Sequence, residues 1–114
     1  MPMKKKIILE LNEKDNIGWY PLLKATDKNN IEMVQLLIDY ATENKIILEL
    51  NEKDDYGYYP LLDATYFDDI EMIKLLIDYA NKNKIILKLN EKVIVDLPQY
   101  LRQYNIIILK CLNC

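Results

Sequence analysis

An internal repeat of 39 residues limits the folds open to this chain more than any other feature. The segment KIILELNEKDNIGWYPLLKATDKNNIEMVQLLIDYATEN, which starts at Lys6, is followed from Lys45 by KIILELNEKDDYGYYPLLDATYFDDIEMIKLLIDYANKN. A repeat of this length is typical of proteins built from units that stack side by side. Since one such unit cannot cover its own apolar face, each copy is expected to bury its neighbour. The sequence therefore predicts a solenoid held by contacts between adjacent repeats.

The first copy predicts a turn, a short helix and a longer helix, in that order. Asp15 and Gly18 are the acidic and glycine residues of a tight turn. Pro21 is tolerated at the first helical position, so it is expected to open a short helix. The pair Asn29 and Asn30 suits a turn and a helix cap. Residues at helical spacing then form the apolar stripe of a second helix: Ile31, Val34, Leu37, Ile38 and Ala41, with Met33, Leu36 and Tyr40 beside them.

This order of elements resembles the ankyrin repeat. The residues that carry the resemblance are D-x-x-G-x-x-P-L-L-x-A at 15–25 and 54–64, followed by N-x-E-M-V-x-L-L-I at 30–38 and D-x-E-M-I-x-L-L-I at 69–77. The resemblance covers about residues 6–92. It implies an all-α fold, an ankyrin-type helical repeat solenoid with two full repeats and degenerate flanks.

The repeat boundaries follow from the same alignment. Residues 1–92 are expected to hold two ankyrin-like repeats with a partial third, repeat 1 at about 6–44 and repeat 2 at about 45–83. The pattern then fails, and 93–114 is interpreted as a degenerate C-terminal capping repeat, since terminal repeats deviate from the others. Within it, 98–104 is expected to be an inner helix and 106–112 a truncated outer element.

Two departures from the family pattern need a physical account. Tyr20 and Leu23 replace the Thr and His that the family usually has, which removes a hydroxyl N-cap worth roughly 1 kcal/mol, although added apolar burial can offset it. The period is also longer than the usual 33 residues or so. The second helix is expected to end near Asn44 and Asn83, because Asn tolerates the left-handed capping conformation. The added run 46–50 could form a short strand, an extended segment or the start of a third helix.

Composition excludes several classes of function. The chain has 114 residues and a formal net charge of −3 at pH 7, which does not suggest nucleic-acid binding. It contains no His and no Ser, so Ser-His, Cys-His and His-metal sites cannot be built from it. We therefore expect neither enzymatic activity nor a metal or other cofactor. Cys111 and Cys114 have C-x-x-C spacing but no further ligands to complete a zinc site.

The cellular location predicted from the sequence is the cytoplasm, with the nucleus as the alternative. The two cysteines give no disulfide framework. The apolar run that follows Lys6 ends at Glu10, too early for a signal peptide or a membrane span. We therefore expect no membrane association.

Comparison of the two copies indicates where a partner could bind. The buried pattern recurs almost unchanged, whereas the differing positions fall mostly on the turn and the inner-helix side, the surface through which ankyrin proteins hold their partners. The resemblance thus implies a non-catalytic module that binds a protein partner, here one with basic edges, because aromatic residues gather among carboxylates. Free drift of exposed positions is the alternative explanation. The candidate partner-binding residues are Asn16, Ile17, Trp19, Lys24, Asp27, Lys28, Asp55, Tyr56, Tyr58, Asp63, Tyr66 and Phe67.

A second hypothesis is structural. No preceding repeat is present for the apolar residues Ile7, Ile8, Leu9 and Leu11 to lie against, and about three repeats are usually needed for independent stability. The chain could therefore be an assembly unit whose exposed ends stack on a longer array or on a second copy, as a homo-oligomer.

Overall fold

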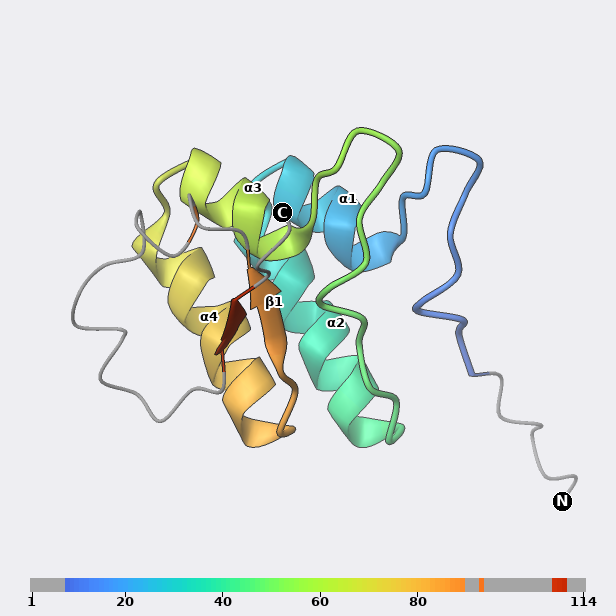
Figure 1. Ribbon diagram of the computed structural model, residues 1–114. Helices are drawn as coiled ribbons and strands as arrows, with labels where there is room; N and C mark the ends of the chain where they lie inside the picture. Colours follow the sequence, from blue (N-terminus) through green and yellow to red (C-terminus); the bar gives the residue numbers. More distant parts are fainter. Residues whose placement is uncertain (1–7, 90–92, 94–107, 111–114) are drawn as a thin grey trace, which may run out of the picture.

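The computed structural model describes residues 8–89, 93 and 108–110 (Figure 1). Each repeat supplies a short inner helix and a longer outer helix, and the two repeats lie side by side. Each inner helix follows a loop that projects from the stack, which we call a finger (residues 13–19 in repeat 1 and 52–58 in repeat 2). The elements are α1 (Pro21–Asp27), α2 (Ile31–Glu43), α3 (Pro60–Tyr66), α4 (Ile70–Lys82), β1 (Leu87–Leu89) and β2 (Ile108–Lys110).

The helices start where the sequence predicts. Pro21 opens α1, and Tyr20 before it makes no side-chain capping bond, as expected from the missing hydroxyl cap. The Tyr20 side chain is nevertheless buried, and its hydroxyl donates a 2.7 Å hydrogen bond to the carbonyl of Glu52 in the next repeat. The outer helix is capped by Asn30, whose side chain accepts from the Met33 amide at 3.1 Å. Tyr20 therefore makes no capping bond within its own repeat but a hydrogen bond to the next repeat.

The outer helices end where predicted, but the residue with the left-handed conformation is not the Asn. Asn44 is the C-cap of α2, and its side chain donates to the Tyr40 carbonyl at 2.9 Å. Asn44 itself has an ordinary negative φ, and the left-handed residue is Lys45, with φ of 58°. Lys84 repeats this with φ of 57°. The expectation that Asn would adopt the left-handed conformation was therefore wrong: both the backbone amide and the side-chain amide of Asn44 donate to the Tyr40 carbonyl in the last turn, and the left-handed residue follows Asn44.

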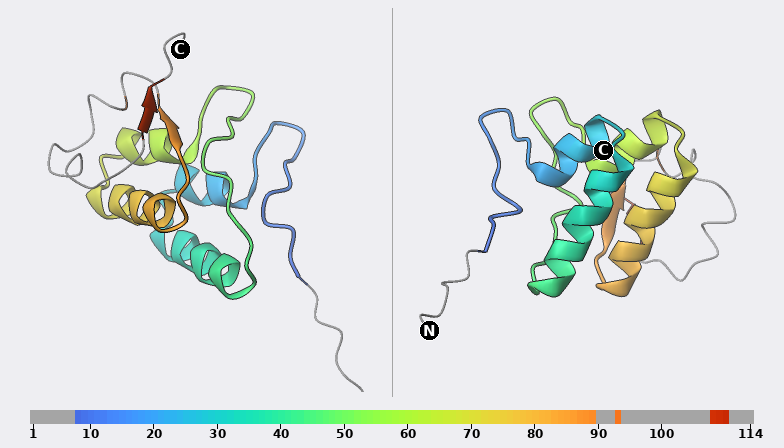
Figure 2. Two further views of the ribbon diagram at one scale, coloured as in Figure 1. Left: turned by 60° about the horizontal axis from the view of Figure 1, so that its bottom comes forward. Right: turned by 180° about the vertical axis from the view of Figure 1, so that it is seen from behind.

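The core lies between the repeats and between the two helical layers. In the chain as described, α1 packs against α3 and α2 against α4 (Figure 2). Each inner helix also packs on the outer helix of its own repeat. The small Ala25 and Ala64 are both buried, which allows close approach of neighbouring helices. The largest fully buried side chains are Tyr20, Tyr59, Leu22, Leu23, Leu48, Leu61, Met72, Ile73, Leu76, Ile77, Leu87 and Leu89.

The six additional residues of each repeat form an extended segment between two side chains that bind its backbone. On one edge, Asn12 accepts from the Glu49 amide at 2.9 Å and donates to the Ile47 carbonyl at 2.8 Å. On the other edge, the Tyr79 hydroxyl accepts from the Leu48 amide at 3.1 Å. Successive peptide groups of an extended chain point to opposite sides. Asn12 can therefore bind the peptide groups on one side of the segment while Tyr79 binds the Leu48 amide on the other. The alternative of a third helix is wrong.

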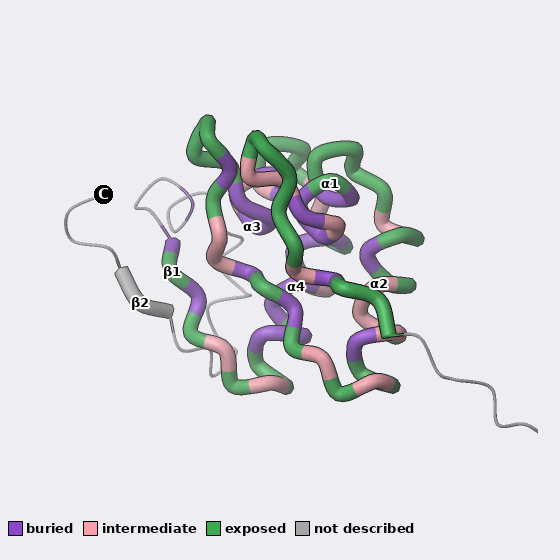
Figure 3. The backbone as a smooth tube through the Cα atoms, turned by 90° about the vertical axis from the view of Figure 1, so that its right-hand side faces the viewer, coloured by how far each residue is buried: buried purple, intermediate pink, exposed green. Residues whose placement is uncertain are grey.

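The same segment in the next copy is the short strand β1. Asn51 holds it as Asn12 holds its predecessor, by donating to the Ile86 carbonyl and accepting from the Lys88 amide. Its other edge pairs in parallel with β2, with Leu87 opposite Ile108. Figure 3 shows the alternation of buried and exposed residues along β1. Of the predicted C-terminal cap, only Val93 and β2 lie within the described residues; β2 is a strand in the expected outer element, and the expected inner helix lies outside them.

Candidate interaction surface

Each finger is folded by one aspartate. The carboxylate of Asp15 accepts hydrogen bonds from the amides of Ile17 (3.0 Å) and Trp19 (2.9 Å). The hydrogen bond from the Trp19 amide is the largest cause that lowers the pKa of Asp15; partial desolvation opposes it, and the Ile17 amide and the Lys24 ammonium add to it. Gly18 then takes φ of 90°, the left-handed region that glycine adopts at least cost. The finger is therefore a preformed turn.

The two fingers are joined directly. The Asp55 amide donates to the Ile17 carbonyl at 2.8 Å, and the indole N–H of Trp19 donates to Asp54 at 2.7 Å. Gly18 also lies so close to finger 2 that an added Cβ would sit 3.0 Å from the Asp54 Cα. The fingers thus present one continuous surface.

The tips of both fingers face solvent. Asn16, Ile17, Asp55, Tyr56 and Tyr58 are exposed, and Tyr56 keeps 73% of its surface accessible. The structure brings these candidates together because the fingers are adjacent. Trp19, in contrast, is partly buried and hydrogen-bonded across the repeats, so its contribution is at least in part structural.

A second group of candidates lies at the C-terminal ends of the inner helices. Tyr66 is 79% exposed and meets Phe67 edge to face, with ring centroids 5.5 Å apart. Asp27 and Lys28, their counterparts in repeat 1, are also exposed. The helices of seven residues that separate this group from the fingers are about 10 Å long. A partner that contacted both groups would have to span at least this distance.

Lys24 and Asp63 occupy equivalent positions but different environments. Lys24 is exposed and lies 3.7 Å from the Asp15 carboxylate. Asp63 is buried between α1 and α3, where its carboxylate lies 3.1 Å from the Thr26 hydroxyl. Burial raises the pKa of Asp63 to about 7, the Thr26 hydrogen bond opposes the shift, and the charges of Asp27 and Asp54 add to it. Burial removes Asp63 from the surface on which the sequence comparison placed it.

A family model of ankyrin repeats, in three copies, matches residues 4–86. The chain belongs to the ankyrin repeat family. Ankyrin repeats are generally protein–protein interaction modules, and proteins built from them are generally non-catalytic. No curated protein and no solved structure gives a significant match.

None of the helices among the described residues of this ankyrin chain is long and apolar enough to cross a bilayer. The same part of the chain contains no group of three or more Cys, Asp or Glu residues arranged to hold a metal ion.

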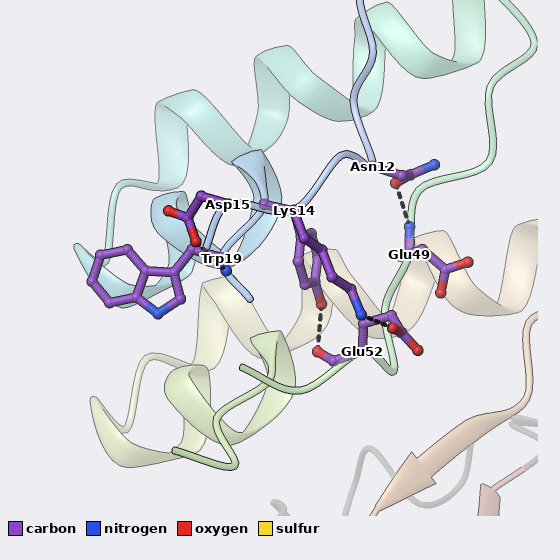
Figure 4. A network of polar contacts seen from close by, with 7 residues as sticks. Asn12, Lys14, Asp15, Trp19, Glu49 and Glu52 are labelled. Carbon is purple, nitrogen blue, oxygen red and sulfur yellow. Dashed lines mark hydrogen bonds and ion pairs between the residues drawn. The ribbon is translucent and has the colours of Figure 1, made fainter. Parts of the chain in front are cut away.

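Sequence reasoning missed a polar network that aligns the two ankyrin repeats (Figure 4). Asn12 binds the backbone at Glu49, and the Lys14 ammonium pairs with the Glu52 carboxylate. A signal for this network was present, since both Asn12 and Lys14 recur 39 residues later although the predicted turn does not require them. Recurrence alone did not single these residues out, because exposed residues such as Glu32 and Asp39 recur as well.

Proposed function

We propose that this ankyrin chain binds a protein partner through its two fingers and the ends of its inner helices. The observation that carries the proposal is the exposure of large aromatic side chains, above all Tyr56 and Tyr66. Because these rings are exposed, they add little to the apolar core that stabilises the fold. Exposed aromatic residues are frequent anchors of protein interfaces. The two fingers are held in place before binding, which lowers the entropy cost of association.

Charge around these rings indicates the chemistry of the partner. Asp55 and Asp68 are exposed beside the aromatic residues of repeat 2, whereas repeat 1 has Asn16 and Asn29 in the same places. Carboxylates that border an aromatic surface favour a partner with Lys or Arg at its edges. We propose an elongated protein segment with basic edges, bound in the cytoplasm or the nucleus.

Site-specific photo-crosslinking tests this surface first. A photoreactive phenylalanine analogue replaces Tyr56 in the full chain, and crosslinked proteins are identified in extract of the source cell. The matched control carries the same analogue at Ile47, which is 54% exposed but lies on the extended segment away from the fingers. A partner crosslinked from position 56 and not from position 47 is the expected result.

The affinity of that purified partner is then measured for the double variant Tyr56→Ala, Tyr58→Ala and for Ile47→Ala. The double variant should bind about 30-fold more weakly, the effect of losing a strong anchor of roughly 2 kcal/mol, while Ile47→Ala binds as the original chain does. Trp19 is left unchanged because its bond to Asp54 supports the fold. Equal affinities for all three proteins would show that the fingers are not the binding surface.

The assembly hypothesis concerns a different surface, the side of repeat 1 that faces away from repeat 2. It is favoured by the exposure of Leu9, Met33 and Leu36 there.

A further inference from the structure

The outward side of repeat 1 exposes residues whose counterparts in repeat 2 are buried. Leu9 is 56% exposed, but Leu48 is 1% exposed. Met33 is 42% exposed, but Met72 is completely buried. Each pair has the same residue type at the same place in the repeat, so the neighbour accounts for the difference. Repeat 1 covers this side of repeat 2, whereas within 8–89 nothing covers the same side of repeat 1.

The exposed side chains of Leu9 and Met33 line an apolar groove of about 400 Å³. It runs between α2 and the extended segment that contains Leu9. A contiguous exposed apolar surface on a folded domain often marks a site of interaction. The groove is lined by Leu9, Leu11, Met33, Leu36, Leu37 and Tyr40, with Asp39 and Glu43 among them.

The backbone beside this groove has one open edge. Within the described part of the chain, the Ile8 carbonyl and the Glu10 amide have no hydrogen-bond partner, although the equivalent groups of Ile47 and Glu49 are both bound by Asn12. Peptide groups left without a protein partner favour a binding partner that can pair with them.

The opposite edge of the same segment is closed. The Leu9 amide donates to the Tyr40 hydroxyl at 2.9 Å, as the Leu48 amide does to Tyr79. The segment around Leu9 is therefore already positioned as in an internal repeat, and only the edge toward a further neighbour is open.

A third feature points in the same direction. Inside the stack, two residues of the preceding repeat bind Glu52. The Lys14 ammonium pairs with its carboxylate, and the Tyr20 hydroxyl donates to its carbonyl. Glu13 is the counterpart of Glu52 one period earlier. It is exposed, and among the described residues neither of these groups has a partner.

We propose that this outward side of repeat 1 is a docking surface for a partner ankyrin-type repeat, which packs on it in the register in which repeat 1 packs on repeat 2. The internal interface defines the chemistry of that partner. It presents an Asn amide to the backbone of Ile8 and Glu10, a Lys two residues later to the Glu13 carboxylate, and a Tyr six residues further to the Glu13 carbonyl. Its apolar helices cover Met33 and Leu36. The inference does not rest on the finger surface.

A duplication within the full chain tests the proposal. Residues 6–44 are inserted a second time directly before Lys6, which recreates the junction between Asn44 and Lys45 and supplies the partner at high effective concentration. The amide of Glu10 in the original repeat 1 should then exchange with solvent at least about tenfold more slowly, and Met33 should be oxidised more slowly by hydrogen peroxide. Unchanged protection of the Leu48 amide verifies that the original interface between repeats has stayed intact.

A matched control separates the amide contact from simple coverage. The same duplication with Asn12→Ala in the added copy should still protect Met33 but should leave the Glu10 amide exchanging at its original rate. If the unaltered duplication changes neither Glu10 nor Met33, the proposal is wrong.

Two other occupants are distinguished in the original chain. Protection of Glu10 that increases with protein concentration would assign the surface to a second copy of this chain, whose Asn51 is already bound to its own Ile86 and Lys88 and so cannot supply the proposed amide contact. Faster exchange at Glu10 after deletion of residues 1–5 would assign it to the chain's own N-terminal residues. Either result would overturn the proposal.

Discussion

At the scale of single residues, equivalent positions in the two repeats have different surroundings within the described part of the chain. Gly18 faces finger 2 at close range, whereas no atom of the described residues lies within 4 Å of a Cβ added at Gly57. Both glycines have positive φ, so replacing either by an L residue would strain the backbone. Only at Gly18 would the new side chain also meet the described residues of finger 2.

Gly18→Ala should therefore destabilise the protein more than Gly57→Ala. We expect a loss of about 1 kcal/mol for Gly57→Ala from backbone strain alone, and about 2 kcal/mol or more for Gly18→Ala, because the backbone at Asp54 must also move. Urea unfolding of the two variants measures the difference. Equal losses would show that the fingers do not approach as closely as described.

Asp63 gives stability a dependence on pH. The Thr26 hydroxyl lies 3.0 Å from the Leu23 carbonyl and 3.1 Å from Asp63. With a single hydrogen it can donate to only one of them, so a protonated Asp63 can donate to the hydroxyl oxygen instead. Because the pKa of Asp63 is raised to about 7, the folded state holds a proton that the unfolded state has released above about pH 4. Stability is predicted to fall as pH rises from about 4 to about 7.

Asp63→Asn should remove most of this slope and raise the free energy of unfolding at pH 8, because the amide can donate at all pH values. Asp78→Asn is the control, since Asp78 is exposed and is not among the groups that shift the pKa of Asp63. Urea unfolding between pH 5 and pH 8 makes the comparison. A pH slope in Asp63→Asn as steep as in the original chain would contradict the assignment.

At the scale of elements, the longer period has a structural reason. The additional residues form an extended segment whose backbone is bound by Asn12 on one side and Tyr79 on the other. Because side chains bind its backbone, such a segment does not have to pair with other strands to satisfy its peptide groups. Among the described residues, only the last of these segments, β1, pairs with another strand.

Replacement of Asn12 by Ala should cost about 1–2 kcal/mol, because the Ile47 carbonyl and the Glu49 amide both lose their partner. The Glu49 amide should also lose protection from hydrogen exchange. Asn16→Ala is the control, since Asn16 is exposed on the finger tip. If both variants unfold at the same urea concentration, the amide of Asn12 does not hold the repeats together.

At the scale of the whole molecule, the repeat pattern predicted the architecture well, because Asp15, Gly18 and Pro21 act through local backbone chemistry. What it could not predict depends on contacts between repeats. The pattern does not show that Asp63 points into the stack while Lys24 points out, or that Trp19 bonds to Asp54. The conformation of 46–50 was also open, since its apolar residues suit several structures and the contacts to Asn12 and Tyr79 decide between them.

Hydrogen exchange in a Val34→Ala variant tests most directly whether contact between adjacent repeats keeps the chain folded. Val34 is fully buried in α2, and the substitution should cost about 1–3 kcal/mol. If neither repeat is stable without the other, the slowest amides of α4, around Ile77, should lose as much protection as those of α2. Amides of α4 that keep their original protection while those of α2 lose theirs would show that repeat 2 folds independently, and would contradict the account.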